Sequence, residues 1–205
     1  AVVVEMVIGV DGAVQESAIY RARVRNHAQL AYNSVAAWLE EGGAVPAEIA
    51  AVAGLAENLL VQDRIAQRLQ NLRHLNGALT LETIEAKPIF EDGQLRGLEA
   101  EEKNRAKEII EDFMIAANGV TARYLAAKQF PSIRRVVRTP KRWDRIVALA
   151  QERGFQLPHN PDSAALDAFL VKAKAADPQR FPDLSLAVIK LLGAGEYIAE
   201  TPGAT

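Results

Sequence analysis

The fold class is decided by a stretch near the middle of the chain, Glu108-Ile-Ile-Glu-Asp-Phe-Met-Ile-Ala-Ala-Asn118. Its apolar residues recur at three- and four-residue spacing, and the pattern extends on both sides, which predicts a long, largely buried helix over residues 103–128. Glu111, Ile115 and Asn118 would share one face of that helix. A carboxylate on a mostly apolar face is costly without a partner. Glu111 is therefore either a functional group or a residue at the edge of the stripe that reaches water.

Two hairpins and five more helices are predicted around this segment. Asp11-Gly12 and Asp92-Gly93 each separate two β-type runs, which is the pattern of a tight hairpin turn. Thr139 and Pro140 are predicted to cap and open one of the helices. The helices are predicted over residues 28–41, 46–72, 139–153, 163–175 and 183–192. Short strands are predicted over residues 79–82 and 133–137, and a loop over residues 197–205. Interleaved helices and strands favour an α+β fold with a helical majority.

Composition excludes several classes of protein. The 205 residues are 49% hydrophobic and 24% charged, which is typical of a globular chain. The net charge of −2 does not by itself predict a nucleic-acid partner. The absence of cysteine excludes disulfides and thiolate metal sites and is typical of a cytoplasmic protein. No apolar run is long enough to cross a bilayer, so no membrane partner is expected. The chain begins in what reads as a strand, so we expect it to come from a longer protein.

Positive charge is concentrated locally. Residues 121–153 hold nine Lys and Arg residues against two acidic ones. Arg21, Arg23 and Arg25 would form a second stripe on one face of a strand. Both clusters could guide a polyanion. They could equally be solvated surfaces that nearby acidic residues neutralise.

Four motifs carry a resemblance to a known family. They are Asn26-His-Ala-Gln-Leu-Ala-Tyr-Asn-Ser-Val35, Gly77-Ala-Leu-Thr-Leu-Glu-Thr-Ile-Glu-Ala-Lys87, Ile109-Ile-Glu-Asp-Phe-Met-Ile-Ala-Ala-Asn118 and Pro131-Ser-Ile-Arg-Arg-Val-Val-Arg-Thr-Pro140. In this order they resemble segments of the ribonuclease II/R (RNB) catalytic domain. The resemblance implies that residues 1–205 are one partial RNB domain, a mixed β-sheet with hairpins surrounded by long helices.

The resemblance also implies a function. The parent protein would be a hydrolase that digests single-stranded RNA processively from the 3′ end, with Mg²⁺, to nucleoside 5′-monophosphates. Tyr32 and Glu111 would line the RNA channel, meet across a groove, and contact the ribose. Leu81, Arg135 and Asn118 complete the expected RNA-binding set.

Departures from the family pattern limit what this chain can do. Leu81 stands where the family commonly has a base-stacking Phe, Val137 where it often has His, and Asp112 where it has a second Glu. Two family motifs, one rich in aspartate and one of the form SPIRRYxD, do not occur in this sequence. We therefore expect no catalytic or metal-binding residue here, Mg²⁺ bound by residues outside the chain, an inactive piece and a monomeric parent. A non-catalytic RNA-binding module is the main alternative, and a helical scaffold without RNA is a third.

Overall fold

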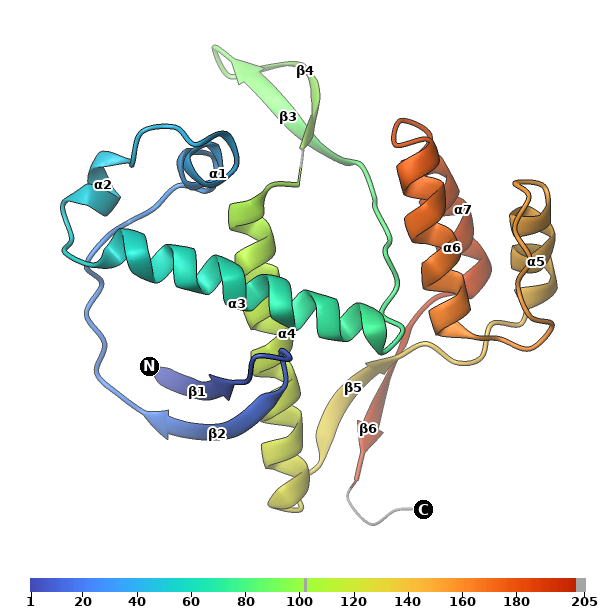
Figure 1. The fold of residues 1–205 in the computed structure, drawn as a ribbon, viewed down its shortest axis with the longest axis horizontal. Helices are drawn as coiled ribbons and strands as arrows, with labels where there is room; N and C mark the ends of the chain where they lie inside the picture. The colour runs from blue at the N-terminus through green and yellow to red at the C-terminus, as the bar shows by residue number, and fades with distance from the viewer. Residues whose placement is uncertain (102, 202–205) are drawn as a thin grey trace. The chain divides into compact units, whose positions relative to one another are not determined.

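The computed structural model describes residues 1–101 and 103–201, which form two compact units (Figure 1). Unit 1 comprises residues 1–72 and 103–131, and the described part of unit 2 comprises residues 73–101 and 132–201. Each unit is assembled from two separate stretches of the chain. Residues distant in sequence therefore build each unit together.

Unit 1 begins with the predicted hairpin, which is confirmed. Strands β1 (Val2–Ile8) and β2 (Val14–Arg21) pair antiparallel, with a bulge between Val7 and Ile8. Gly12 in the turn has φ +83°, and a Cβ there would lie 2.4 Å from the backbone oxygen of Arg68. The turn thus requires glycine both for its backbone angle and for its close approach to a neighbouring helix.

Four helices complete unit 1: α1 (Tyr32–Glu41), α2 (Ala47–Ala50), α3 (Leu55–Leu75), whose last three residues belong to unit 2, and α4 (Arg105–Ala127). The long helix predicted from the central segment is α4, which Asn104 caps through the backbone N–H of Lys107. The helix predicted over residues 28–41 begins later, at α1. The one predicted over residues 46–72 is interrupted at residues 51–54, where Gly54 has φ +76°.

The core of unit 1 joins its helices near the start of α4. Val35 and Ala36 of α1, Ile49 of α2, Leu59 of α3 and Ala106 of α4 are buried in one cluster. Each helix contributes at least one apolar side chain to this cluster. Burial of these side chains fixes α1 against the first turns of α4.

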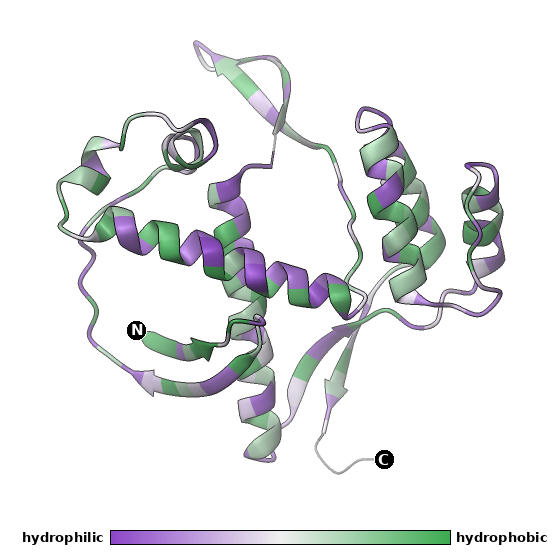
Figure 2. Cartoon of the chain, viewed as in Figure 1, coloured by the Kyte–Doolittle hydropathy of each residue, from purple (hydrophilic) through white to green (hydrophobic). Residues whose placement is uncertain are grey.

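Unit 2 is built around three helices, α5 (Trp143–Gln151), α6 (Ser163–Ala176) and α7 (Phe181–Leu192), whose hydrophobic residues are green in Figure 2. Their largest fully buried side chains include Ile146, Leu166, Leu170 and Phe181. The prediction that Thr139 caps the first of these helices was wrong. The helix begins at Trp143, whose side chain is buried and donates a hydrogen bond to the oxygen of Pro158 at 2.9 Å.

The strands of unit 2 form two pairs. β3 (Glu85–Glu91) and β4 (Gln94–Glu101) make the hairpin predicted at Asp92-Gly93. β5 (Ser132–Val136) pairs antiparallel with β6 (Glu196–Glu200), where a loop had been predicted. A short window of sequence could not reveal β6, because its partner lies about sixty residues away.

The predicted strand over residues 79–82 is absent from the described structure. Its backbone instead bonds to helix side chains. The N–H of Thr80 donates to Asp167 of α6 at 2.6 Å, and the N–H of Glu82 donates to Ser185 of α7 at 2.7 Å. Asp167 and Ser185 are both buried, so these two side chains hold the segment on the helical core of unit 2.

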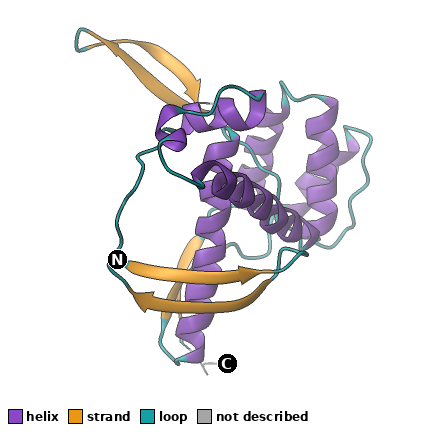
Figure 3. Ribbon diagram, turned by 60° about the vertical axis from the view of Figure 1, so that its left-hand side comes forward, coloured by secondary structure: helices purple, strands orange, loops and turns teal. Residues whose placement is uncertain are grey.

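The α+β class with a helical majority is confirmed, but its sheets differ from expectation. In the described part of the chain the strands form three separate two-stranded antiparallel sheets, not one mixed sheet (Figure 3). Within residues 1–101 and 103–201, no helix is both long and apolar enough to span a bilayer.

Candidate nucleic-acid interface

Tyr32 and Glu111, the two residues expected to contact ribose, lie on adjoining helices of unit 1. Tyr32 is the first residue of α1, and its side chain is 49% exposed. Its neighbour Asn33 accepts a hydrogen bond of 3.3 Å from Asn104, the cap of α4. Glu111 follows about 10 Å further along α4, at the ~1.5 Å rise per residue of a helix. Neither residue is sealed inside the protein.

Arg105 holds the two helices together. Its backbone N–H donates to Glu40 of α1 at 2.8 Å. Its guanidinium donates twice to Asp63 of α3, at 2.9 and 2.5 Å, and once to Glu108 at 2.5 Å. Burial alone would lower the pKa of Arg105, but the hydrogen bonds and charges of Asp63 and Glu108 outweigh it and raise that pKa. Arg105 therefore stays charged and ties α1, α3 and α4 into one support.

Glu111 lies on an exposed face, which corrects the expectation of a largely buried helix with Glu111 on its apolar side. Ile115 and Asn118, which share this face, are also exposed. The buried residues of α4 lie elsewhere, at Ala106, Ile109, Asp112 and Val120. Asp112, with 2% of its surface exposed, is the buried carboxylate of α4. The carboxylate of Glu111 therefore reaches water, as expected for a residue at the edge of the apolar stripe, and it is accessible to a ligand.

The carboxylate of Glu111 is held only weakly. Its one ion pair in the described chain is with the Lys103 ammonium, at 3.9 Å, and both side chains are about half exposed. Such exposed pairs contribute roughly 0–1 kcal/mol. A ligand hydroxyl could therefore take the place of Lys103 at little cost.

The other three residues expected to bind RNA are divided between the two units. Asn118 lies with Tyr32 and Glu111 in unit 1, whereas Leu81 and Arg135 belong to unit 2. Leu81 is partly buried and packs against the helical core of unit 2. Arg135 is exposed on β5, in register with Tyr197 of β6, and has no ion pair among the described residues.

The basic window at residues 121–153 is partly neutralised by β6, whose acidic residues sequence reasoning did not connect with it. Arg134 pairs with Glu200 at 2.6 Å, and Arg138 pairs with Glu196. Within this window, the exposed cations without an ion pair in the described chain are Arg123 of α4 and Lys128 at its C-cap, and Arg135, Lys141, Arg142 and Arg145 of unit 2. In unit 2, positive charge therefore persists mainly around the start of α5.

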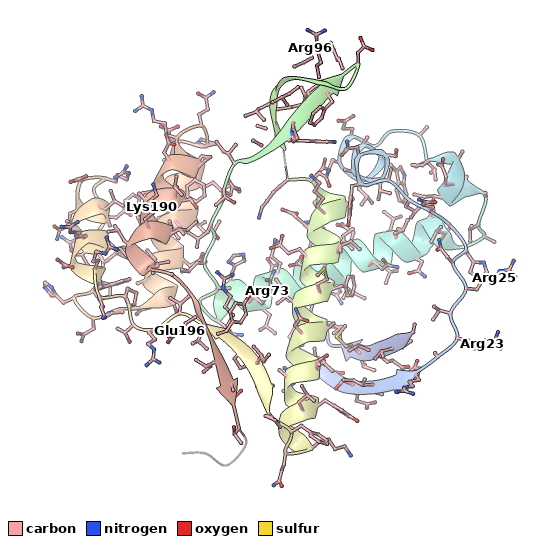
Figure 4. The ribbon with its side chains drawn as sticks, turned by 180° about the vertical axis from the view of Figure 1, so that it is seen from behind. Arg23, Arg25, Arg73, Arg96, Lys190 and Glu196 are labelled. Atoms are coloured by element: carbon pink, nitrogen blue, oxygen red, sulfur yellow. The ribbon has the colours of Figure 1, made fainter. Side chains whose placement is uncertain are left out.

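The second basic stripe is only partly on a strand. β2 ends at Arg21, and Arg23 and Arg25 follow in an irregular connection, where Figure 4 shows them pointing away from the ribbon. All three are exposed, and none has an ion pair within the residues described. The expectation of one strand face thus fails, although the charges remain accessible.

Sequence reasoning missed the residues that position the site. Asp63 and Arg105 are forty-two residues apart and carry no local motif. Only the capping pattern of Asn104 before α4 was visible as a signal. In the described ranges, no three or more His, Asp or Glu side chains gather closely enough to hold a metal ion.

The sequence of this chain is similar to those of known proteins. The RNB domain family matches residues 1–204. Exoribonuclease 2 of Shigella boydii is 29% identical over 178 residues, which are 85% of this chain and 27% of that protein. Exoribonuclease 2 of Salmonella paratyphi B is 29% identical over 130 residues, which are 62% of this chain and 20% of that protein. The chain thus spans about a quarter or less of these curated relatives.

Solved structures show the same fold. Mycoplasma genitalium RNase R in its apo form matches with a TM-score of 0.82 at 17% identity, over 96% of this chain and 31% of that one. The same protein in complex with double-stranded RNA matches with a TM-score of 0.83 at 18% identity, over 96% and 35% of the two chains. With the family match over nearly all of its residues, the chain belongs to the RNB domain family.

Proposed function

We propose that this chain forms part of the RNA-channel wall of an exoribonuclease that hydrolyses single-stranded RNA processively from the 3′ end to nucleoside 5′-monophosphates. The RNB match over residues 1–204 is the observation that carries the proposal. Relatives named Exoribonuclease 2 support it. So does the likeness to RNase R, which was solved with ribose-methylated single-stranded RNA.

Ribose recognition is the role proposed for unit 1. A carboxylate accepts a hydrogen bond from a 2′-hydroxyl, which DNA lacks. Glu111 is exposed and weakly paired, so it can accept such a bond. The ring of Tyr32, exposed on the adjoining helix, offers a surface for the sugar or its base to pack against.

Mg²⁺ is the cofactor proposed for the whole enzyme. It takes oxygen ligands in near-octahedral geometry, from carboxylates, waters and substrate phosphates. The described residues hold no cluster of three or more His, Asp or Glu side chains that would form a metal centre. We therefore assign the metal to residues outside this chain and derive no hydrolytic step from the residues present.

A degradation assay tests the proposal. Single-stranded RNA labelled at its 5′ end is incubated with the intact protein and Mg²⁺, and the products are resolved over time. We expect the full-length RNA to be replaced directly by a short 5′-labelled end product with few intermediates, and unlabelled nucleoside 5′-monophosphates to accumulate, while the 205-residue chain alone degrades nothing. Internal cuts, shortening from the 5′ end, or metal-dependent degradation by the chain alone would overturn the assignment.

The proposal also includes a location and an assembly state: we propose that the protein is cytoplasmic and monomeric.

A non-catalytic RNA-binding module is the second candidate. The packing of Leu81 against the core of unit 2 favours it, because leucine lacks the π-face that stacks on a terminal base. The same assay separates the two functions. A module would bind the labelled RNA and leave its length unchanged in Mg²⁺.

A further inference from the structure

Unit 2 contains a hollow of about 260 Å³ beside the start of α5. One wall is the connection that carries Arg138, Lys141 and Arg142, and the other is the end of α7 with the residues up to Glu196. Figure 4 marks Glu196 at the start of β6. Sequence reasoning placed these cations in a basic window without indicating that they surround one cavity.

The charges around the hollow do not cancel. Arg138 forms an ion pair with Glu196. The hydrogen bond that the guanidinium donates to Glu196, and the charge of that carboxylate, raise the pKa of Arg138. Glu196 is the one acidic residue in the lining, and Lys141 and Arg142 have no ion pair in the described chain. Asp144 is the nearest further acid in sequence, and it does not line this hollow but a neighbouring pocket that shares Thr139 and Lys141 with it. Two positive charges therefore remain uncompensated at this hollow.

The size and lining of the hollow fit a small anion better than a base. Pockets for drug-sized ligands occupy roughly 300–1,000 Å³, which is more than the volume here. No aromatic ring lines the hollow, so a nucleobase would have nothing to stack on. Arginine presents planar paired donors to a phosphate, and lysine adds a compact charge. The carbonyl end of α7 disfavours an anion slightly, and Lys190 in its last turn offsets that effect.

We propose that this hollow, through Lys141 and Arg142, binds one backbone phosphate of the RNA strand. The inference rests on the proposed function, because it presupposes that the protein binds RNA. It adds a contact in unit 2 to the ribose contacts of unit 1. This contact would position the strand without reading its sequence.

Salt-dependent binding tests the inference. The affinity of the intact protein for a fluorescent single-stranded RNA is measured by anisotropy in metal-free buffer over a range of NaCl concentrations. For single strands, log K falls with log salt by about 0.7 for each phosphate neutralised. The Lys141→Ala/Arg142→Ala variant should therefore show a slope smaller by about 0.7 and weaker binding to every sequence alike.

A matched control removes the same charges elsewhere in unit 2. Lys172→Ala/Arg180→Ala also loses one lysine and one arginine, neither of which lines the hollow. This variant should keep the slope of the unmodified protein. All four side chains are exposed, and equal unfolding temperatures would show that both variants remain folded.

The outcomes separate the inference from the proposed function. If the unmodified protein does not bind RNA, the proposed function fails and the inference fails with it. If it binds with a steep salt slope that Lys141→Ala/Arg142→Ala leaves unchanged, only the inference fails. A nucleoside 5′-monophosphate provides the second arm. If its binding, and not that of RNA, depends on these two residues, the hollow takes a free phosphate monoester and the backbone assignment is wrong.

Discussion

Removing Asp63 should loosen the support beneath the candidate ribose site. Asp63 lies on α3 and receives two hydrogen bonds from Arg105, the first residue of α4. The pair is mostly buried, with 17% of the Asp63 side chain and 21% of the Arg105 side chain exposed. Asp63→Ala leaves Arg105 with Glu108 as its remaining acidic partner.

The expected cost lies between two limits. Breaking an exposed ion pair costs roughly 0–1 kcal/mol, and removing one partner of a fully buried pair costs about 3–5 kcal/mol. The pair is partly exposed, and the contact between Arg105 and Glu108 remains in the variant. Asp63→Ala should therefore lower the free energy of unfolding by about 2 kcal/mol, between the two limits. A chain of 205 residues would show a fall of about 4–8 °C in the unfolding temperature, and a longer intact protein should show a smaller one.

Urea and thermal unfolding of the intact protein would measure the effect. Glu91→Ala is the matched control, because it also removes a carboxylate that pairs with an arginine, but at 3.5 Å and with both side chains more than half exposed. It should change stability by less than about 1 kcal/mol. If the two variants are equally stable, Arg105 and Asp63 do not support the site, and the reasoning is refuted.

Two further pairs of substitutions test local contacts, one pair at hairpin turns and one at Asp167. Gly12→Ala places a Cβ 2.4 Å from the oxygen of Arg68 at φ +83°, so urea unfolding should show a loss of about 2–4 kcal/mol. Gly93→Ala, at φ +74° with nothing within 4 Å, should lose only about 1–2 kcal/mol, and equal losses would contradict the close contact. Asp167→Ala removes the acceptor for Thr80, which leaves a partly buried N–H unsatisfied and should cost about 1–3 kcal/mol by the same measurement. Asp167→Asn keeps an acceptor oxygen and should cost less; if it costs as much as alanine, the hydrogen bond to Thr80 is not what stabilises the segment.

Local signals in the sequence predicted local structure well. Asp11-Gly12 and Asp92-Gly93 specify hairpins because their backbone conformations suit the tight turn. The apolar spacing around Ile109 specified α4 because a helix of that length must bury one stripe. Helix starts were less certain. Thr139-Pro140 has the composition of a helix start, but burial of Trp143 places the start three residues later.

Long-range partners explain what the sequence could not predict. β6 exists because it pairs with β5, and residues 79–82 are not a strand because Asp167 and Ser185 take their backbone donors. The exposure of Glu111 could not be predicted for the same reason, because it depends on contacts between distant parts of the chain. Periodicity placed it beside apolar residues, but only the packing of the other helices decided which face of α4 is buried.

Discrimination between RNA and DNA tests the ribose site most directly. The intact protein is titrated in metal-free buffer with single-stranded RNA and with DNA of the same sequence, and the ratio of the two affinities is compared between the unmodified protein and Glu111→Ala. A hydrogen bond to a charged group contributes about 1.5–3 kcal/mol, so the preference for RNA should fall roughly 10- to 100-fold. Glu57→Ala, which removes an exposed acid from α3, should leave the ratio unchanged. If Glu111→Ala also leaves it unchanged, or alters RNA and DNA binding equally, Glu111 does not contact the 2′-hydroxyl.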